Sequence, residues 1–197
     1  MMKYGRRLKK SIEPLFKAPT DQGTSIKVFF CDEARFGRIN NIRRCWVPQG
    51  SRAIVKQQMV REHTYAFTAV CPFSGETYSI ITPICNTAAM NELLKGVSKQ
   101  YSKEHIVMIA DRAGWHRSRE LKLPSNIRIT LLPPYSPELN PTEHIWDYIR
   151  EQKQFNNYCF HSLEEVEDHL EDVLKQLHNE KDYLQSLCTF NGMTNSS

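Results

Sequence analysis

Short apolar runs separated by polar turns make up most of the chain before residue 133. Runs rich in β-branched and aromatic residues, or with alternating apolar and polar positions, are typical of buried and half-buried strands. Such runs predict strands at residues 25–31, 64–71, 77–82, 105–110 and 127–132. The turn sequence PFSGE joins the second run to the third and predicts a β-hairpin.

Apolar positions recur at helical spacing in three further segments. They predict helices over residues 86–101, about 141–154 and 163–178. Ser162 and Glu165 form a capping box at the start of the third helix. An antiparallel start followed by strand–helix–strand crossovers predicts an α/β fold, with a mixed five-stranded sheet and helices on both faces.

Basic residues gather in two segments outside these elements. Residues 1–24 are a basic N-terminal extension, which is either solvated or an arm that contacts phosphate. The second segment surrounds the sequence PQGS, which predicts an inserted hairpin. Its basic residues either line a nucleic-acid groove or form a solvated face; they are Arg35, Arg38, Arg43, Arg44, Arg52 and Lys56.

Composition narrows the class of protein. The 197 residues are 40% hydrophobic and 24% charged, as in a soluble domain with its own core, and the net charge of +4 permits a polyanionic partner. The six cysteines include no CxxC pair, which indicates reduced thiols in a cytoplasmic protein. No apolar run reaches the ~20 residues of a membrane span. We expect one domain over residues 25–190 and a frayed tail over residues 191–197.

A proline-rich stretch, LLPPYSPELNPTEHIWDYIR, precedes and opens the second predicted helix. Proline restricts its own φ and the residue before it, so this loop is stiff. Asn140 is a suitable N-cap, and Pro141 suits the first helical position. Glu143 then falls in the first turn. There it either complements the helix dipole or is held as a ligand at a fixed place.

Three acidic residues follow or open the predicted elements. Asp32 follows the first strand, Asp111 follows the fourth, and Glu143 opens the helix after the fifth. Parallel strands present their carboxyl ends at one edge of a sheet, where the three would meet. Clustered carboxylates repel one another unless cations neutralise them, and Mg²⁺ and Mn²⁺ prefer such ligands. Two such ions would support phosphoryl transfer on nucleic acid. Alternatively, the three carboxylates do not form a common site, and each only caps the element that it follows or opens.

Three sequence blocks carry a resemblance to a known family. FFCDEARFG, IADRAGWHRS and LLPPYSPELNPTEHIWDYIR resemble the signature blocks of the mariner superfamily of DDE transposases, in its bacterial insertion-sequence branch. The resemblance implies a ribonuclease H-like fold and a catalytic, metal-binding triad of Asp32, Asp111 and Glu143, with two Mg²⁺ or Mn²⁺ ions. It also implies a homodimer that cuts DNA at transposon ends and transfers the 3′-hydroxyl end into target DNA.

Five further residues are candidates for supporting the site or contacting DNA. Glu33 is expected on the opposite strand face from Asp32, in a structural or supporting role. His116 either orients a phosphate or a metal-bound water, or only caps a loop. Arg112 and Arg117 either contact phosphate or are solvated. Asn140 is expected to cap the helix rather than bind metal.

One departure from the family pattern bears on function. About 25 residues precede the first predicted strand, too few for the helix-turn-helix module with which such transposases read transposon ends. We therefore expect a catalytic fragment, one product of a split reading frame, or a decayed copy. Recognition of transposon ends is then either lost or supplied by a separate helix-turn-helix chain. Two other functions stay open: a ribonuclease H-like nuclease without strand transfer, and a non-catalytic DNA-binding module.

Overall fold

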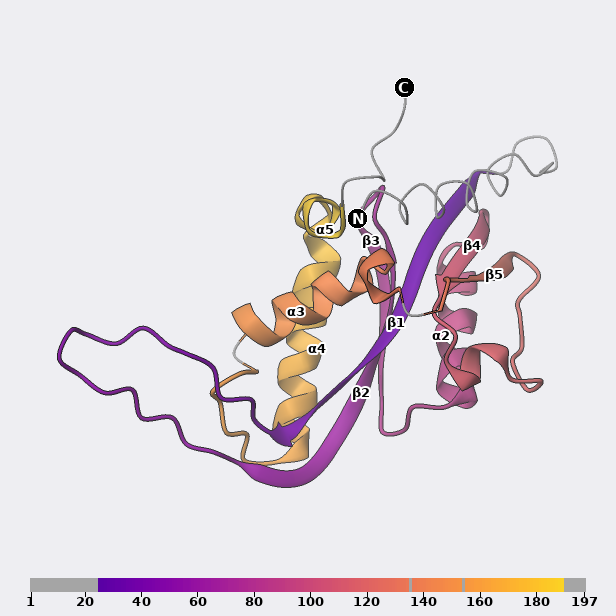
Figure 1. Ribbon diagram of the computed structural model, residues 1–197. Helices are drawn as coiled ribbons and strands as arrows, with labels where there is room; N and C mark the ends of the chain where they lie inside the picture. Colours follow the sequence, from indigo (N-terminus) through magenta and orange to yellow (C-terminus); the bar gives the residue numbers. More distant parts are fainter. Residues whose placement is uncertain (1–24, 135, 154, 190–197) are drawn as a thin grey trace.

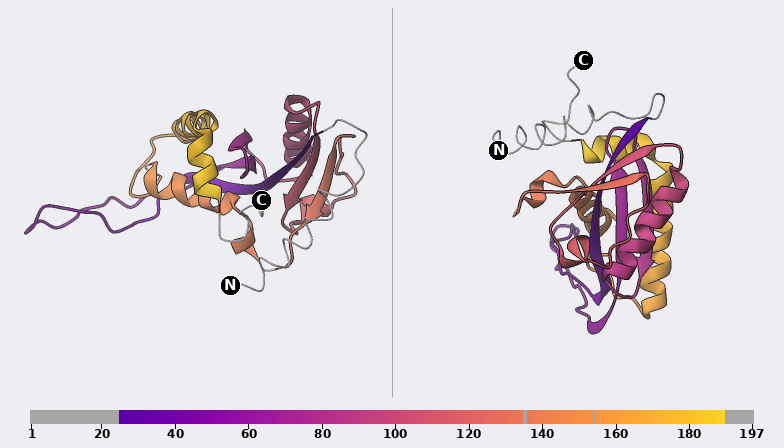
Figure 2. Two further views of the ribbon diagram at one scale, coloured as in Figure 1. Left: turned by 90° about the horizontal axis from the view of Figure 1, so that it is seen from above. Right: turned by 90° about the vertical axis from the view of Figure 1, so that its right-hand side faces the viewer.

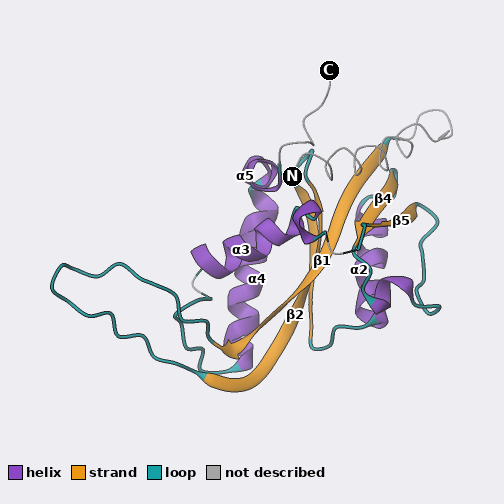
Figure 3. Ribbon diagram, in the orientation of Figure 1, coloured by secondary structure: helices purple, strands orange, loops and turns teal. Residues whose placement is uncertain are grey.

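The computed structural model describes residues 25–134, 136–153 and 155–189 (Figure 1). The predicted basic extension at residues 1–24, the tail at residues 191–197 and Tyr135 of the proline-rich loop lie outside the described residues. The described chain folds around a five-stranded sheet of order β3-β2-β1-β4-β5 (Figure 3).

The sheet is mixed, as the sequence predicted. β1 (Ile26–Ile39) lies at its centre and pairs antiparallel with β2 (Met59–Cys71) and parallel with β4 (His105–Ala110). β3 (Glu76–Thr82) forms the predicted hairpin with β2, and β5 (Ile127–Leu131) pairs parallel with β4. The parallel strands β1, β4 and β5 therefore run toward one edge of the sheet.

Helices cover both faces of the sheet. α2 (Thr87–Gln100) packs on one face, and α3 (Thr142–Gln152) and α4 (Leu163–Asn179) pack on the other. α5 (Lys181–Cys188) joins the second group, with Leu184 and Cys188 buried; it was not predicted. It has eight residues and no side-chain cap, so its sequence signal is weak. No helix among the described residues is both long and apolar enough to span a membrane.

The central strand divides the core in two. Phe30 packs in the core with α3 and α4, whereas Phe29 and Cys31 pack in the core with α2. Because successive side chains of a strand point to opposite faces, Asp32 continues the first row and Glu33 continues the second. The predicted opposite orientation of these two acids follows from this alternation.

β1 is longer than predicted. It was expected to end at Cys31, but it continues to Ile39. The pairing with β4 ends at Phe30, whereas the pairing with β2 continues to Ile39. Asp32 therefore lies within β1, just past its last parallel pair, and is not at the end of the strand.

Residues 40–58 form a long projection that joins β1 to β2, called the arm below (Figure 2). The predicted turn is present: the backbone N–H of Ser51 donates to the carbonyl of Pro48 at 3.0 Å, and Gly50 has a φ of +85°. The predicted strands on either side of it are wrong. Their apolar side chains, such as the fully exposed Trp46, have no layer of protein to pack against, and a hairpin without packing is weakly stabilised.

Candidate active site

Asp32 is held on the α3 side of the sheet. The indole N–H of the buried Trp146, in α3, donates to Asp32 Oδ2 at 3.2 Å. Burial, and then the charges of Glu33 and Glu143, raise the pKa of Asp32 to about 7. The site therefore disfavours the charged form of this carboxylate, as expected for a carboxylate whose charge no cation neutralises.

Asp111 follows β4 directly and is half-exposed, with 50% of its side chain accessible. Its Oδ1 accepts two hydrogen bonds, from His116 Nδ1 at 2.8 Å and from the backbone N–H of Ala113 at 2.9 Å. The hydrogen bond from His116 lowers the pKa of Asp111 below its ordinary value, although partial burial opposes this. Asp111 is therefore ionised at neutral pH.

Glu143 lies in the first turn of α3, which begins at Thr142, one residue after the predicted start. The proline-rich loop forms a short 3₁₀ helix, Pro137–Leu139, before it. Burial raises the pKa of Glu143, and Arg150 opposes that rise. The loop and the helix start together place this carboxylate beside the sheet edge.

Asn140 connects the proline-rich loop to the central strand. Its Nδ2 donates to the backbone carbonyl of Cys31 at 3.3 Å, and its Oδ1 accepts from the backbone N–H of Thr142 at 3.3 Å. Its side chain is buried, with 4% exposed. The N-cap of α3 is Pro141, with no side-chain cap hydrogen bond, so the predicted N-cap role of Asn140 is wrong. Asn140 instead holds the first residue of α3 against the residue that precedes Asp32.

The three carboxylates line one cavity of about 470 Å³ at the carboxyl edge of the parallel strands. Its other walls come from the loops after β4 and β5, namely Arg112, Ala113, Leu132, Pro133, Pro134, Ser136, Pro137 and Asn140. As they stand, no three His, Cys, Asp or Glu side chains among the described residues are grouped closely enough to hold a metal ion. The donor set nevertheless fits a hard divalent cation: all three groups are carboxylates, and partial burial, then the charges of Glu33 and Glu143, disfavour the charged form of Asp32.

The remaining predicted residues divide into three groups. Glu33 and the buried His116 face each other behind Asp111, with His116 Nε2 3.8 Å from Glu33 Oε2. Arg112 lines the cavity, and its Nε donates to the carbonyl of Leu132 at 3.0 Å. Arg117 is exposed at the end of the 3₁₀ helix after Asp111 and does not line the cavity.

Sequence reasoning missed Trp146 as a partner of Asp32. A signal was available, because Trp146 lies three residues after Glu143 and therefore on the same side of α3. The carbonyl groups of Cys31 and Leu132, which hold Asn140 and Arg112, carry no sequence signal at all.

Comparison with known proteins decides the family. The model of the family described as "DDE superfamily endonuclease" matches residues 27–167. The chain belongs to this family. The matched region contains all three carboxylates of the cavity, together with Glu33, Asn140 and His116, whereas α5 lies beyond it.

One curated relative of this DDE chain comes from Sinorhizobium fredii. It is named "Uncharacterized protein y4pE/y4sA" and is 40% identical over 106 residues, which cover 53% of this chain and 78% of the relative.

Among solved structures, the fold is similar to that of Mos1 mariner. The Mos1 paired end complex with Mn has a TM-score of 0.58 at 15% identity, and the pre-cleavage Mos1 transpososome has a TM-score of 0.58 at 17% identity. Each match covers 95% of this chain, and 62% and 63% of the Mos1 chain, respectively. The DDE chain therefore has the predicted ribonuclease H-like fold, and it spans about three-fifths of the length of these Mos1 chains.

Proposed function

We propose that this DDE endonuclease domain is the catalytic domain of a transposase, extending over residues 25–190. It cuts DNA at transposon ends and transfers the freed 3′-hydroxyl end into target DNA. The observation that carries the proposal is the single cavity shared by Asp32, Asp111 and Glu143, which come from three separate elements.

The metal requirement follows from this donor set. Asp32, Asp111 and Glu143 would hold Mg²⁺ or Mn²⁺, in two ions, and the structures of Mos1 with Mn and with Mg support these ions. When bound, such ions activate water and stabilise the oxygen atoms around a phosphodiester. A bound cation would also favour the charged form of Asp32, which burial and then the charges of Glu33 and Glu143 disfavour.

The protein's own residues hold the three carboxylates in place. Trp146 holds one oxygen of Asp32, His116 holds one oxygen of Asp111, and the proline-rich loop holds the start of α3. Arg112, anchored on the carbonyl of Leu132, adds a positive charge to the same cavity and would contact a DNA phosphate. The site thus binds a phosphodiester and its metal ions in one geometry.

The test compares two Asp→Asn substitutions. Asp111→Asn should abolish Mg²⁺-dependent nicking of a labelled DNA duplex and leave the fold intact. Asp182→Asn, on the exposed start of α5, should nick like the wild-type protein. Undiminished nicking by Asp111→Asn contradicts the proposed active site.

A second assay separates the transposase from a nuclease that only cleaves. A DNA fragment with a labelled, pre-cleaved 3′ end is incubated with target plasmid and Mn²⁺. Joined product supports strand transfer. Nicking without joined product favours a ribonuclease H-like nuclease, or a domain that needs a separate helix-turn-helix chain for end recognition.

The proposed assembly is a homodimer on DNA, and the arm supports it. Trp46 is fully exposed, and the exposed fractions of Ile54, Ile42 and Val47 are 92%, 51% and 40%. A second copy of the chain would cover these apolar side chains. The arm also carries Arg43, whose guanidinium pairs with Glu151 at 3.2 Å near the base of the arm.

A further inference from the structure

We infer that Glu33 and His116 form a positioning pair behind Asp111, which fixes the orientation of its carboxylate for metal binding. This inference rests on the proposed function, since it concerns the same site. The contact chain runs from Glu33 Oε2 to His116 Nε2 at 3.8 Å, and from His116 Nδ1 to Asp111 Oδ1 at 2.8 Å.

Burial separates this pair from an ordinary loop contact. His116 is 4% exposed, and 13% of the Glu33 side chain is accessible. Glu33 Oε2 and His116 Nε2 are both buried without a hydrogen bond to any described residue. Two buried polar atoms without a hydrogen bond destabilise a fold, and an apolar pair would fill the same space without that cost. The polar pair therefore serves something other than packing.

The geometry at Asp111 shows what the pair does. His116 and the backbone N–H of Ala113 both donate to Oδ1, so the rotation of the carboxylate is restricted. Oδ2 accepts no hydrogen bond from the described residues, and Asp111 lines the cavity. A carboxylate held by one oxygen presents the other to a metal, in the way that supporting hydrogen bonds orient metal ligands in general.

The central strand supplies both sides of the site. Asp32 faces the α3 side, where Trp146 holds it, and Glu33 faces the α2 side, where His116 lies. Two successive residues of β1 thus contribute to the placement of two carboxylates from different elements. Glu33 is a positioning residue that acts through His116, and it does not itself touch the cavity.

The test replaces His116 by two amide side chains of different length. In His116→Asn the amide nitrogen occupies the place of Nδ1, and in His116→Gln it occupies the place of Nε2. We expect His116→Gln to weaken Mn²⁺ binding about 10- to 100-fold, as measured by titration calorimetry without DNA. His116→Asn, which retains the donor to Asp111 but loses the contact with Glu33, should weaken binding only several-fold, less than His116→Gln. Thermal melting of each variant verifies that it is folded.

Two controls make the outcome decisive. Asp111→Asn should lose Mn²⁺ binding; if it binds like the wild-type protein, the proposed metal site itself is wrong. If Asp111→Asn loses binding while folded His116→Gln retains wild-type affinity, the positioning inference is wrong and the proposed function stands. Should His116→Gln fail to fold, Glu33→Gln decides by the same titration: several-fold weaker binding supports the inference, and unchanged affinity overturns it.

Discussion

The side chain of Asn140 donates a hydrogen bond to the backbone carbonyl of Cys31 at 3.3 Å, across 109 positions of sequence. Cys31 immediately precedes Asp32, and Asn140 lies three residues before Glu143. This contact therefore holds two carboxylates of the proposed site in register with each other. The prolines restrict the loop, and this contact ties its end to the central strand.

Replacing Asn140 tests that relation. Asn140→Ala removes the hydrogen bonds to Cys31 and Thr142 and leaves a carbonyl without its partner, so the free energy of unfolding should fall by about 1–3 kcal/mol. Nicking should fall about tenfold or more, because Glu143 is no longer held at a fixed position relative to Asp32. Urea unfolding and a nicking assay on the folded protein measure the two effects.

The matched control is Ser162→Ala, which removes the N-cap of α4 far from the cavity. It should cost about 1 kcal/mol of stability and leave nicking unchanged. Equal losses of nicking in both variants would mean that lower stability alone explains the result.

The raised pKa of Asp32 predicts a pH dependence of stability. The pKa of Asp32 is about 7 in the folded protein and ordinarily 3.8. Between these two pH values, the folded state therefore keeps a proton on Asp32 that the unfolded state has released. Its contribution to stability therefore falls as the pH rises from about 4 to 7. In metal-free protein, Asp32→Asn should raise the free energy of unfolding at pH 8 by roughly 1–3 kcal/mol. At pH 4 the two proteins should differ little, and the same gain at both pH values would contradict this origin.

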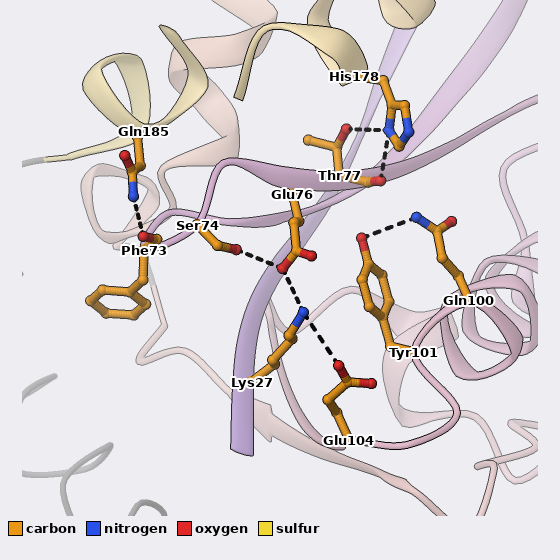
Figure 4. Close-up of polar contacts among 10 residues, drawn as sticks. All are labelled: Lys27, Phe73, Ser74, Glu76, Thr77, Gln100, Tyr101, Glu104, His178 and Gln185. Atoms are coloured by element: carbon orange, nitrogen blue, oxygen red, sulfur yellow. Dashed lines mark hydrogen bonds and ion pairs between the residues drawn. The ribbon is translucent and has the colours of Figure 1, made fainter. Parts of the chain in front are cut away.

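An ion pair remote from the site predicts the opposite pH dependence (Figure 4). Lys27 Nζ lies 2.7 Å from Glu76 Oε2, which also accepts from Ser74. Burial raises the pKa of Glu76, but these hydrogen bonds outweigh it and lower the pKa below its ordinary 4.5. The stabilisation is therefore present above pH 4.5 and is lost as the pH falls through the lowered pKa. Glu76→Gln should cost about 1 kcal/mol at pH 7 and almost nothing at pH 2, in urea titrations at both pH values.

The arm predicts the oligomeric state. The wild-type protein should sediment as a dimer, and a Trp46→Ser, Ile54→Ser double variant should sediment as a monomer with an unchanged circular dichroism spectrum. Leu123→Ser, at an exposed apolar residue outside the arm, should stay dimeric. A dimeric double variant would place the interface elsewhere, and a monomeric wild-type protein would contradict the homodimer.

Arg112 predicts a salt effect on DNA binding. Arg112→Ala should weaken duplex binding several-fold and reduce the dependence of log K on log[salt] by about 1, as expected for one lost phosphate contact. Lys95→Ala, on α2 and paired with Glu92, should change neither quantity. Fluorescence anisotropy over a series of salt concentrations measures both variants, and an unchanged slope for Arg112→Ala would exclude the contact.

Local patterns in the sequence predicted most of the elements. The strand and helix periods, the PFSGE turn and the Ser162 cap led to five strands and three of the four α-helices described, because these signals depend on neighbours a few residues away. These local signals failed where packing between distant segments determines whether a strand forms and how long it is. β1 extends beyond Cys31 because β2 continues beside it, and the arm forms no strands because nothing covers it.

By itself, the sequence predicted the residues of the proposed site: three carboxylates in three specific blocks, with Asp32 and Glu33 on opposite faces of one strand. Only the tertiary structure decided their partners. Trp146 holds Asp32, His116 lies between Asp111 and Glu33, and Asn140 binds the carbonyl of Cys31. The physical reason is the distance along the sequence over which each feature is set. Side-chain alternation is set by the backbone of each residue, whereas these contacts join distant segments that meet only when the sheet and helices pack.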